Sequence, residues 1–558
     1  METKNVIAAI SLSAAVIILY SLFFAPTQEE LKRNQVKKES IQKNSDTPSL
    51  DKNETFVKLS RKDALLESRR IIFENNNIIG SISLKGATID DLTFKEYSIA
   101  LNSNDKVILL NPKNFENGYL IESGFVTANK NIDVPDASTL WEVSGNTRLT
   151  NNSPIKLTWS NSQDITFEKH ISLDDKFLFT VKEKIINRSD KSYNFYSYGQ
   201  IIRNKIPKIS GFYILHEGFL SVLDDELIEE DYDDIQEKKF TRTAQEGFVG
   251  ISDKYWITSV IPQKGKEFKT TFDYKNKFRA NYISTQGTEV GPNSSLEEKI
   301  QIITAAKRVN IIDGYAENLK INKFDLVIDW GFMYFITKPL FFALDYFFKL
   351  LGNYGLAIIA VTVCIRLAFF PLANFSFKSM GKMKLLAPEM ARLKELHKDD
   401  KRKLQQEMMA LYKKEKVNPM SGCLPILVQI PVFFAFYKIL FVTLEMRHMP
   451  FYGWIKDLSD RDPTSIFNLF GLIPWDPPSF LLIGAWPIIM GITMFIQQKL
   501  NPTPPDPIQA KIFMFFPLFL TIILAPFAAG LVIYWSFNNI FTMIQQYIVQ
   551  RKMTVKTT

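Results

Sequence analysis

Cysteine and histidine are scarce in this chain of 558 residues, which has two cysteines, Cys364 and Cys423, and four histidines. A disulfide-stapled scaffold needs several paired cysteines and is therefore excluded. No group of residues has the spacing of a zinc site, so we predict no metal and no cofactor. The chain also lacks the P-loop, H-E-x-x-H and G-x-S-x-G motifs. These absences argue against hydrolysis of nucleotides or peptides, and we expect no enzymatic activity.

Acidic residues are missing from the longest apolar runs. Four blocks without Asp or Glu cover residues 354–373, 422–443, 480–499 and 511–549. Each is long enough for a membrane-spanning helix, which needs about 20 mostly apolar residues. The last block exceeds one crossing, and Pro526 and Gly530 predict a turn that divides it into two helices. Residues 353–550 are therefore expected to form a five-span helical core.

A further apolar stretch, residues 6–25, lies near the N-terminus and would measure about 30 Å as a helix. A secretory signal peptide is the alternative, but its apolar part is usually about 7–15 residues long and ends in small residues. This stretch ends Phe-Phe-Ala-Pro, which favours an uncleaved transmembrane anchor over residues 1–27. Residues 28–55 hold six Lys or Arg and six Asp or Glu with few apolar residues, as in a flexible linker.

Alternating apolar and polar residues dominate the segment from 56 to 321. Ile155 and Leu157 lie on one side of a predicted strand, and a turn-like run of Asn, Ser, Gln and Asp follows it. Such alternation between turn clusters is typical of antiparallel strands with one buried face. We therefore predict a large β-sandwich. Its histidines, His170 and His216, have no ligand-like neighbours and are expected at the surface or in hydrogen bonds.

Residues 326–352 are rich in Phe, Trp and Tyr but carry charges on one side. Lys338, Asp345 and Lys349 are separated by seven and four residues, so they share one face of a helix. An amphipathic helix of this kind is suited to a membrane interface. Pro339 is expected to interrupt any continuous span.

The charges of the loops predict how the chain crosses the membrane. Residues 374–421 hold twelve Lys or Arg against six Asp or Glu, a net charge of +6, whereas residues 444–479 hold three against five, a net charge of −2. The positive-inside rule places the first loop and the basic tail, 551–558, in the cytoplasm. Six crossings then put both termini inside and the β-domain outside. Four basic residues just after the anchor oppose this topology: Lys32, Arg33, Lys37 and Lys38.

Arg366 is a charged residue inside an apolar block, roughly 12 Å of helix from the cytoplasmic end of that block. An unpaired charge at mid-helix costs about 2.5 kcal/mol or more in lipid. The usual remedy is a buried carboxylate, but the apolar blocks contain none. Arg366 is therefore predicted to face water inside the helix bundle, which makes it the leading candidate for a functional residue.

Other polar residues of the spans are candidates for lining the same cavity. Thr362 lies one turn before the arginine, Gln429 lies in the next span, and Trp535 and Asn539 share a face of the last helix. Hydrogen bonding between helices is the alternative use of such side chains. Both uses stay open for the Thr, Gln and Asn, whereas helix–helix bonding is favoured for Gln546, which is close to the interface.

Residues 375–417, between the second and third spans, predict a helical hairpin with methionine-rich apolar stripes. The stripe residues considered for client docking are Met380, Met383, Met390, Leu393 and Met408. Flexible, polarisable methionine side chains suit the binding of varied hydrophobic partners. Packing of the two hairpin helices on each other is the alternative.

The segment EKVNPMSGCLPILVQIPVFFAFY, residues 415–437, closely resembles the signature of the YidC family of membrane protein insertases. QEMMALYKKEKVNP before it and GLVIYWSFNNIFTMIQQ at 530–546 agree with this family. The resemblance, to the six-span Gram-negative type, is strong over residues 326–550 and looser over the anchor and the β-domain. Residues 466–479 look like an insertion relative to the family.

The resemblance implies a polytopic α-helical membrane protein of the bacterial inner membrane, with an insertase core of five helices, an N-terminal anchor and a periplasmic β-supersandwich similar to sugar-mutarotase folds. It also implies a hydrophilic groove. Arg366 matches the family's groove arginine, and Thr362 and Trp535 match client-contact positions, although members usually have Tyr at the last one. Implied partners are nascent membrane proteins, a Sec-type translocon, ribosome–nascent chain complexes with their targeting machinery, and membrane lipids. A long ribosome-tethering tail is not matched.

We therefore predict a membrane protein insertase and chaperone that passes client segments through the groove, alone or with a translocon. Partitioning of a client helix into lipid is expected to drive the process without ATP. A secondary transporter with an anion site at Arg366 is the alternative, and it predicts inverted repeats that are not evident. A carbohydrate-active β-domain is a second alternative, and it predicts a carboxylate or histidine constellation that is not evident either. No direct nucleic-acid partner is expected, although residues 378–416 are basic.

Overall fold

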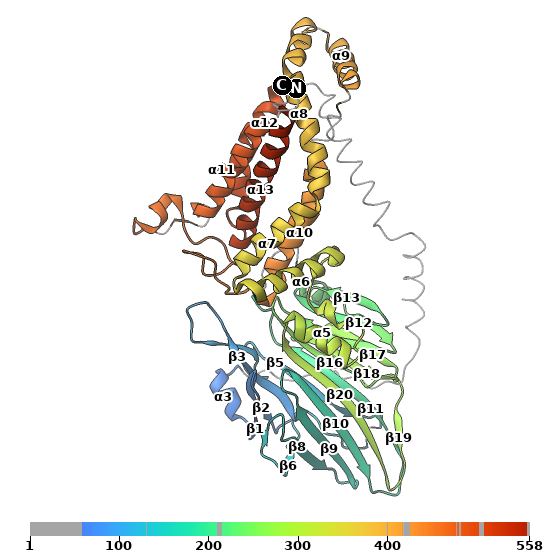
Figure 1. Ribbon diagram of the computed structural model, residues 1–558. Coiled ribbons are helices and arrows are strands. Elements are labelled where there is room, and N and C mark those ends of the chain that lie inside the picture. The colour runs from blue at the N-terminus through green and yellow to red at the C-terminus, as the bar shows by residue number, and fades with distance from the viewer. Residues whose placement is uncertain are drawn as a thin grey trace. The chain divides into compact units, whose positions relative to one another are not determined.

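Figure 1 shows the computed structural model of the chain. It describes residues 58–129, 131–208, 215–398, 400–415, 417, 424–475, 477–478, 481–501 and 507–554. The predicted anchor and linker, and Cys423, lie outside the described residues.

The strands between Arg70 and Ala306 form two sheets. The order of the 11-stranded sheet is β14 (Phe240–Ala244), β17 (Phe268–Tyr274), β18 (Phe278–Ser284), β11 (Tyr193–Arg203), β5 (Tyr119–Val126), β3 (Thr88–Ser98), β2 (Ile78–Ser83), β1 (Arg70–Glu74) and β7 (Arg148–Leu149), with β19 (Thr288–Val290) beside β11 and β4 (Lys106–Leu110) beside β3. The order of the 9-stranded sheet is β13 (Glu226–Glu230), β12 (Gly218–Leu223), β15 (Gly247–Ser252), β16 (Trp256–Ile261), β20 (Ser294–Ala306), β10 (Leu178–Asn187), β9 (Ile165–Leu173), β8 (Ile155–Ser160) and β6 (Glu142–Ser144). The named pairings are antiparallel except that of β1 with β7.

Aromatic side chains join the two sheets across a common core. Phe73 on β1 meets Phe179 on β10 edge to face at 5.1 Å between ring centroids, and Phe167 on β9 meets Phe195 on β11 at 5.8 Å. Each pair links one sheet to the other, and all four side chains are buried. Alternate residues along each strand point into this core, as period-two patterning requires. The predicted β-sandwich is therefore confirmed.

The predicted turn at 161–164 joins β8 to β9. Asn161 directs the turn, because its side-chain oxygen accepts hydrogen bonds from the backbone N–H groups of Gln163 (2.9 Å) and Ile165 (3.0 Å). The two histidines of the domain have polar contacts, as expected. His170 lies 3.3 Å from Glu168, and a ring nitrogen of His216 lies 2.9 Å from the Phe219 carbonyl.

Short helices flank the sandwich, and a longer one follows it. They are α3 (Arg61–Leu66), α4 (Tyr232–Glu237), α5 (Val309–Asn318), the 3-10 helix η1 (Phe324–Val327) and α6 (Tyr334–Leu351). The expectation that Pro339 would interrupt the segment is wrong, because Pro339 lies inside α6. It is the sixth residue of the helix, so the backbone hydrogen bond that it removes is one near the first turn. Lys338 pairs with Asp313 (3.0 Å) and Asp325 (2.8 Å), which ties α6 to the preceding segments.

The remaining helices form the helical core. They are α7 (Tyr354–Ala368), α8 (Phe370–Leu396), α9 (Lys401–Lys414), α10 (Leu424–Val442), the 3-10 helices η3 (Leu444–Met446) and η4 (Ile466–Gly471), α11 (Ala485–Leu500), α12 (Pro507–Leu524) and α13 (Ala529–Thr554). In Figure 1, α11, α12 and α13 lie together, and α9 folds back beside the far end of α8. The predicted turn at 526–530 is confirmed by the break between α12 and α13.

One helical prediction is wrong. The apolar block 354–373 is not a single helix, because α7 ends at Ala368 and α8 begins at Phe370 with a bend of 68°. Pro371, in the first turn of α8, explains the break, since proline lacks the N–H that a continuing helix needs. By length and hydropathy, no single helix in the described segments is long and apolar enough to cross a membrane, whereas α7 and α8 pass this test together as a bent pair.

Polar contacts connect the β-domain to one end of the helical core. Lys438 on α10 pairs with Asp329 at 2.8 Å, and Arg447, after η3, donates to the Ser98 carbonyl at 2.7 Å. Glu445 accepts a hydrogen bond of 2.8 Å from the first N–H of α5. The loop between α10 and α11 therefore lies on the β-domain side of the core.

Candidate functional site

Arg366 lies in the last turn of α7 and its side chain reaches two other helices. Its Nε donates to the side-chain oxygen of Asn538 on α13 at 2.9 Å, and its Nη2 donates to the side-chain oxygen of Gln429 on α10 at 2.9 Å. Nη2 also contacts the same oxygen of Asn538. The guanidinium is half-buried where α7, α10 and α13 meet, whereas the next residue, Leu367, is exposed. The arginine therefore points into the bundle.

The partners of the guanidinium are neutral amides. In the part of the chain that the structure describes, Arg366 forms no ion pair with an acidic side chain. Hydrogen bonds from a charged donor contribute about 1.5–3 kcal/mol each, which offsets much of the cost of burying the group. Amide oxygens do not cancel the charge, however. The site therefore keeps a full positive charge that is hydrogen-bonded but not neutralised.

A second layer of contacts holds these amides in place. Gln429 donates its amide N–H to the hydroxyl of Tyr534, so its oxygen is left to face the arginine. Tyr534 is buried and stacks on Phe436 with 4.2 Å between ring centroids. Gln545 donates to the backbone carbonyl of Arg366 at 3.2 Å, which satisfies one of the carbonyl groups that the end of α7 leaves without a helical partner. The arginine site thus combines side chains from three helices.

The structure brings only some of the predicted residues to Arg366. Gln429 contacts it directly. Thr362 is buried one turn earlier on α7, and its hydroxyl donates to the Ile358 carbonyl of its own helix. Asn539 points elsewhere and donates to Thr493 on α11 at 3.2 Å. The role of these residues in client contact stays a prediction.

Trp535 is half-buried, and its ring lies 4.8 Å from that of Phe433 on α10. It packs beside a small buried cluster of Met490, Leu524 and Val532. Gln546 donates to the Leu500 carbonyl and to the Asn501 side chain at the end of α11, both at 3.1 Å. Its predicted use as a link between helices is therefore confirmed.

Sequence analysis missed three contacts of the arginine site: Tyr534, Asn538 and Gln545. They follow each other at offsets of four and seven residues, so they lie on one face of α13. The predicted stripe that includes Trp535 and Asn539 lies one residue further along the chain. Both stripes are polar in sequence, and only the packing of α13 against α7 and α10 distinguishes them.

The predicted docking residues on the hairpin have different surroundings. Met380 is buried with Phe377 and with Val549 of α13, so it belongs to the packing of α8 on the bundle. Met390 accepts a weak contact of 3.9 Å from the Tyr412 hydroxyl of α9. Met383, Leu393 and Met408 are half-buried. These contacts favour helix packing for Met380 and Met390.

Other apolar side chains of the hairpin are exposed instead: Leu385, Leu396 and Met409. Leu385 and Leu396 lie on α8, and Met409 lies on α9. Exposed apolar side chains at this end of the molecule remain available to a hydrophobic partner.

Family models cover most of the chain. A model described as the YidC periplasmic domain matches residues 70–343, and one described as 60Kd inner membrane protein matches residues 346–556. The boundary between the two models falls inside α6.

Relatives match the chain over its full length. A protein of Pelagibacter ubique named membrane protein insertase YidC is 84% identical over 558 residues, which is 100% of both chains. A protein of the same name from Brucella suis is 43% identical over 590 residues, covering 100% of this chain and 97% of that protein. Another from Rickettsia conorii is 44% identical over 559 residues, covering 98% and 99%.

Two solved structures are also similar. A crystal structure of an active YidC insertase covers 86% of this chain and 92% of its own, with a TM-score of 0.35 and 14% identity. A galactose mutarotase related enzyme from Lactobacillus acidophilus covers 43% of this chain and 98% of its own, with a TM-score of 0.33 and 13% identity. The sequence identity of 43–84% to the named relatives over the whole chain, together with the two family models, shows that the chain belongs to the YidC family of membrane protein insertases.

Proposed function

We propose that Arg366 and its amide partners form the client-binding site through which this insertase passes polar segments of nascent membrane proteins. The supporting observation is a cation held by neutral Asn538 and Gln429 rather than by a carboxylate. A resident acid would cancel the charge and leave nothing to attract a client. Neutral amides keep the arginine in place while its field remains available.

The first step is capture of an acidic or otherwise electron-rich polar segment. A client carboxylate replaces the amide oxygens of Asn538 and Gln429, because charge-assisted bidentate pairs with arginine are about twice as strong as neutral hydrogen bonds. The displaced Gln429 keeps its hydrogen bond to Tyr534. The exchange leaves few donors unsatisfied, so the barrier to it is low.

The second step is movement of the client's apolar helix into lipid. Exposed apolar side chains follow α10 at Leu427, Ile430 and Phe434, and α13 carries Ile544 and Ile548. These two helices also supply the partners of Arg366, so a client that binds there has apolar surface on either side. Transfer of the client helix into lipid supplies the free energy, and no nucleotide is required.

Short helices lower the barrier that the polar segment meets. α7 has 15 residues and α11 has 16, which is roughly 22–24 Å of helix against a hydrocarbon core of about 30 Å. A mismatch of this size is relieved by local thinning of the bilayer. The polar segment therefore crosses a thinner apolar layer beside Arg366.

The family models describe an inner membrane protein with a periplasmic domain. Within that frame we propose that both termini are cytoplasmic and that clients first dock at the 375–417 hairpin, where Leu385, Leu396 and Met409 are exposed. A Sec-type translocon and ribosome–nascent chain complexes are the proposed partners. No catalytic step is assigned. The secondary-transporter alternative finds no support among the named relatives.

Site-specific photocrosslinking of a stalled nascent membrane protein tests the proposal. A photoreactive residue is placed at Thr362, Gln429 or Trp535, with Leu518 of α12, which faces outward, as the matched control. We expect adducts at the first three positions and weaker ones at the control. Equal yields at all four positions would show that the client does not use the arginine site.

A further inference from the structure

A short loop between α10 and α11 exposes apolar side chains without any charge. From residue 463 to residue 475 the chain has no charged side chain. Its exposed apolar side chains include Phe467, Leu469, Phe470, Leu472, Ile473 and Trp475. We call residues 465–475, which include η4, the aromatic loop. In Figure 1 this orange segment extends sideways from the N-terminal end of α11, away from the β-strands.

Hydrogen bonds within the aromatic loop satisfy several of its backbone groups. Asn468 is the hub: its carbonyl accepts from Ile473 N–H (3.0 Å), its side-chain oxygen accepts from Gly471 N–H (3.0 Å), and its side-chain nitrogen donates to the Trp475 carbonyl (3.3 Å). Phe470 N–H donates to the Ser465 carbonyl at 2.7 Å. Non-helical backbone is tolerated near lipid only where its polar groups have partners. The loop meets part of that requirement through its own residues.

Two bulky residues of the loop adopt a conformation that usually belongs to glycine or asparagine. Leu469 has φ 48° and ψ 47°, and Phe470 has φ 59° and ψ 32°, both in the left-handed region. Glycine would adopt this conformation without strain. The backbone is therefore strained at Leu469 and Phe470, and both side chains are exposed.

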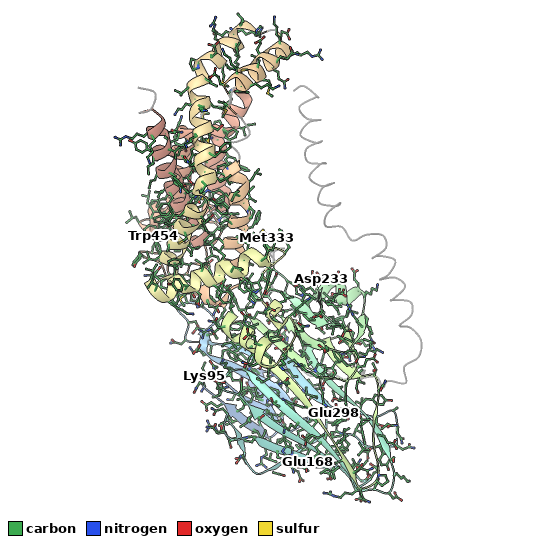
Figure 2. The ribbon with its side chains drawn as sticks, turned by 45° about the vertical axis from the view of Figure 1, so that its right-hand side comes forward. Lys95, Glu168, Asp233, Glu298, Met333 and Trp454 are labelled. Carbon is green, nitrogen blue, oxygen red and sulfur yellow. The ribbon has the colours of Figure 1, made fainter. Side chains whose placement is uncertain are left out.

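The base of the loop is fixed to the start of α11. The carboxylate of Asp462 accepts from the backbone N–H of Trp486 at 2.9 Å and from the indole N–H of Trp454 at 3.1 Å. Ile466 N–H donates to the Ile483 carbonyl at 3.0 Å. Figure 2 labels Trp454, which lies beside the helices. These hydrogen bonds therefore connect the loop directly to the N-terminal end of α11.

Two kinds of surface could cover such a patch, a protein or a bilayer. Protein interfaces usually have a polar and charged rim around their apolar centre. The aromatic loop lies in an uncharged stretch of 13 residues, 463–475, and Trp and Phe are side chains that favour the interface of a bilayer. α11, which follows the loop, also carries exposed apolar side chains such as Ile492 and Phe495.

We infer that the aromatic loop inserts into the bilayer leaflet on the β-domain side and anchors the N-terminal end of α11 there. The ligand is the lipid surface itself, at the depth of the headgroups and first methylenes. This anchor does not involve Arg366. A result that contradicts it would therefore leave the proposed client site unaffected, and the reverse also holds.

Fluorescence quenching in vesicles tests the anchor. Leu472→Cys is introduced with Cys364→Ser and Cys423→Ser, labelled with an environment-sensitive nitrobenzoxadiazole dye and reconstituted as the full chain in phosphatidylethanolamine and phosphatidylglycerol. The matched leucines are Leu66 on α3, which is 74% exposed, and Leu518 on α12, which is 60% exposed, against 83% for Leu472. Quenchers are nitroxide-labelled lipids and aqueous iodide.

We expect nitroxide lipids to quench the dye at position 472 several-fold more than the dye at position 66. A nitroxide near the headgroup should quench more strongly at position 472, and a nitroxide deep in the acyl chain should quench more strongly at position 518. Iodide quenching at Leu472, as at Leu66, would overturn the anchor. Protection from both quenchers would also overturn it, because a protein would then cover the loop. Retained client insertion by each labelled chain shows that it is folded.

Discussion

Two buried cations of the β-domain and Arg366 of the helical core have different kinds of partner. In the β-domain, Lys169 lies 3.0 Å from Glu183 and Arg279 lies 2.7 Å from Asp273, and all four side chains are at most 10% exposed. In the described part of the helical core, the side chain of Arg366 donates to the amide oxygens of Asn538 and Gln429 and to no carboxylate. The β-domain neutralises these two buried cations, whereas the helical core keeps the charge of Arg366 available.

Under the proposed function, this difference separates charges that hold the fold from a charge that binds a client. A buried ion pair is costly to break, because either member alone would be an uncompensated charge. It therefore holds one arrangement and offers nothing to a ligand. An arginine held by amides has lost much of its hydration yet remains charged, so an anion that reaches it gains more than it would in water. Arg366 has this second arrangement.

The largest expected effect is on the β-domain pair. Glu183→Ala leaves Lys169 buried without its carboxylate and should lower the free energy of unfolding by about 3–5 kcal/mol. Urea unfolding of the full chain, followed by tryptophan fluorescence, measures it. Glu226→Ala, which removes an ion pair with Arg242 near the surface, is the control and should cost less than about 1 kcal/mol. If both variants lose a similar free energy of unfolding, the buried Lys169–Glu183 pair does not stabilise the fold more than a surface pair does.

Glu445 tests the junction between the two regions. It is a buried carboxyl with no ion pair among the residues placed by the structure, and burial raises its pKa from 4.5 to about 7. The folded state therefore holds a proton that the unfolded state has released, so stability falls as pH rises from about 4.5 to about 7. The loss is about 3 kcal/mol.

Thermal unfolding of the full chain between pH 5 and pH 8 measures this effect. Glu445→Gln keeps the acceptor for the N–H of Val309 and cannot ionise, so its curve should lack this part of the decline. An identical pH dependence in the two proteins would mean that Glu445 is ionised in the folded state.

Arg366→Ala should affect insertion more than stability. Loss of one charge-assisted contact of about 1.5–3 kcal/mol corresponds to roughly 10–100-fold slower insertion of a client with an acidic tail. Arg366→Lys keeps the charge but not the bidentate geometry, so it should retain part of the rate. Reconstituted vesicles and a protease-protection assay give the rates. An unchanged rate in Arg366→Ala would exclude a role in client capture.

The smallest expected effect comes from a substitution that gives Arg366 a carboxylate partner within the protein. Asn538→Asp makes the helical core resemble the β-domain, and insertion of the acidic client should fall about tenfold, or roughly 1.4 kcal/mol. Asn538→Leu removes the amide without adding charge and is the matched control, with a much smaller loss. If Asp and Leu behave alike, the free charge of Arg366 is not what clients recognise.

Local patterns predicted much of this molecule. Period-two alternation identified strands such as the one containing Ile155 and Leu157, and the absence of acidic residues from the apolar blocks predicted that Arg366 would have no carboxylate partner there. The pairing of distant strands, such as β11 with both β5 and β18, depends on contacts far apart in the chain, which local alternation does not specify.

The arginine site shows the same limit at a finer scale. Asn538 and Asn539 are equivalent in sequence, yet the first contacts Arg366 and the second contacts Thr493. One residue turns a helix by about 100°, so the choice depends on how α13 packs against its neighbours. The break at Phe369 was missed because the apolar run continues through Pro371 and masks the helix end.

The bend beside Phe369 has a mechanical consequence. α8 extends from this bend to Leu396, about 40 Å along the helix axis, and its buried contact with Val549 is at Met380, roughly 15 Å from the bend. The part of α8 beyond Met380, roughly 24 Å of helix, extends past this buried cluster. We expect a load at its tip to bend this part of the helix more easily than the part packed beside α13, so the hydrogen bonds of the guanidinium should be little disturbed.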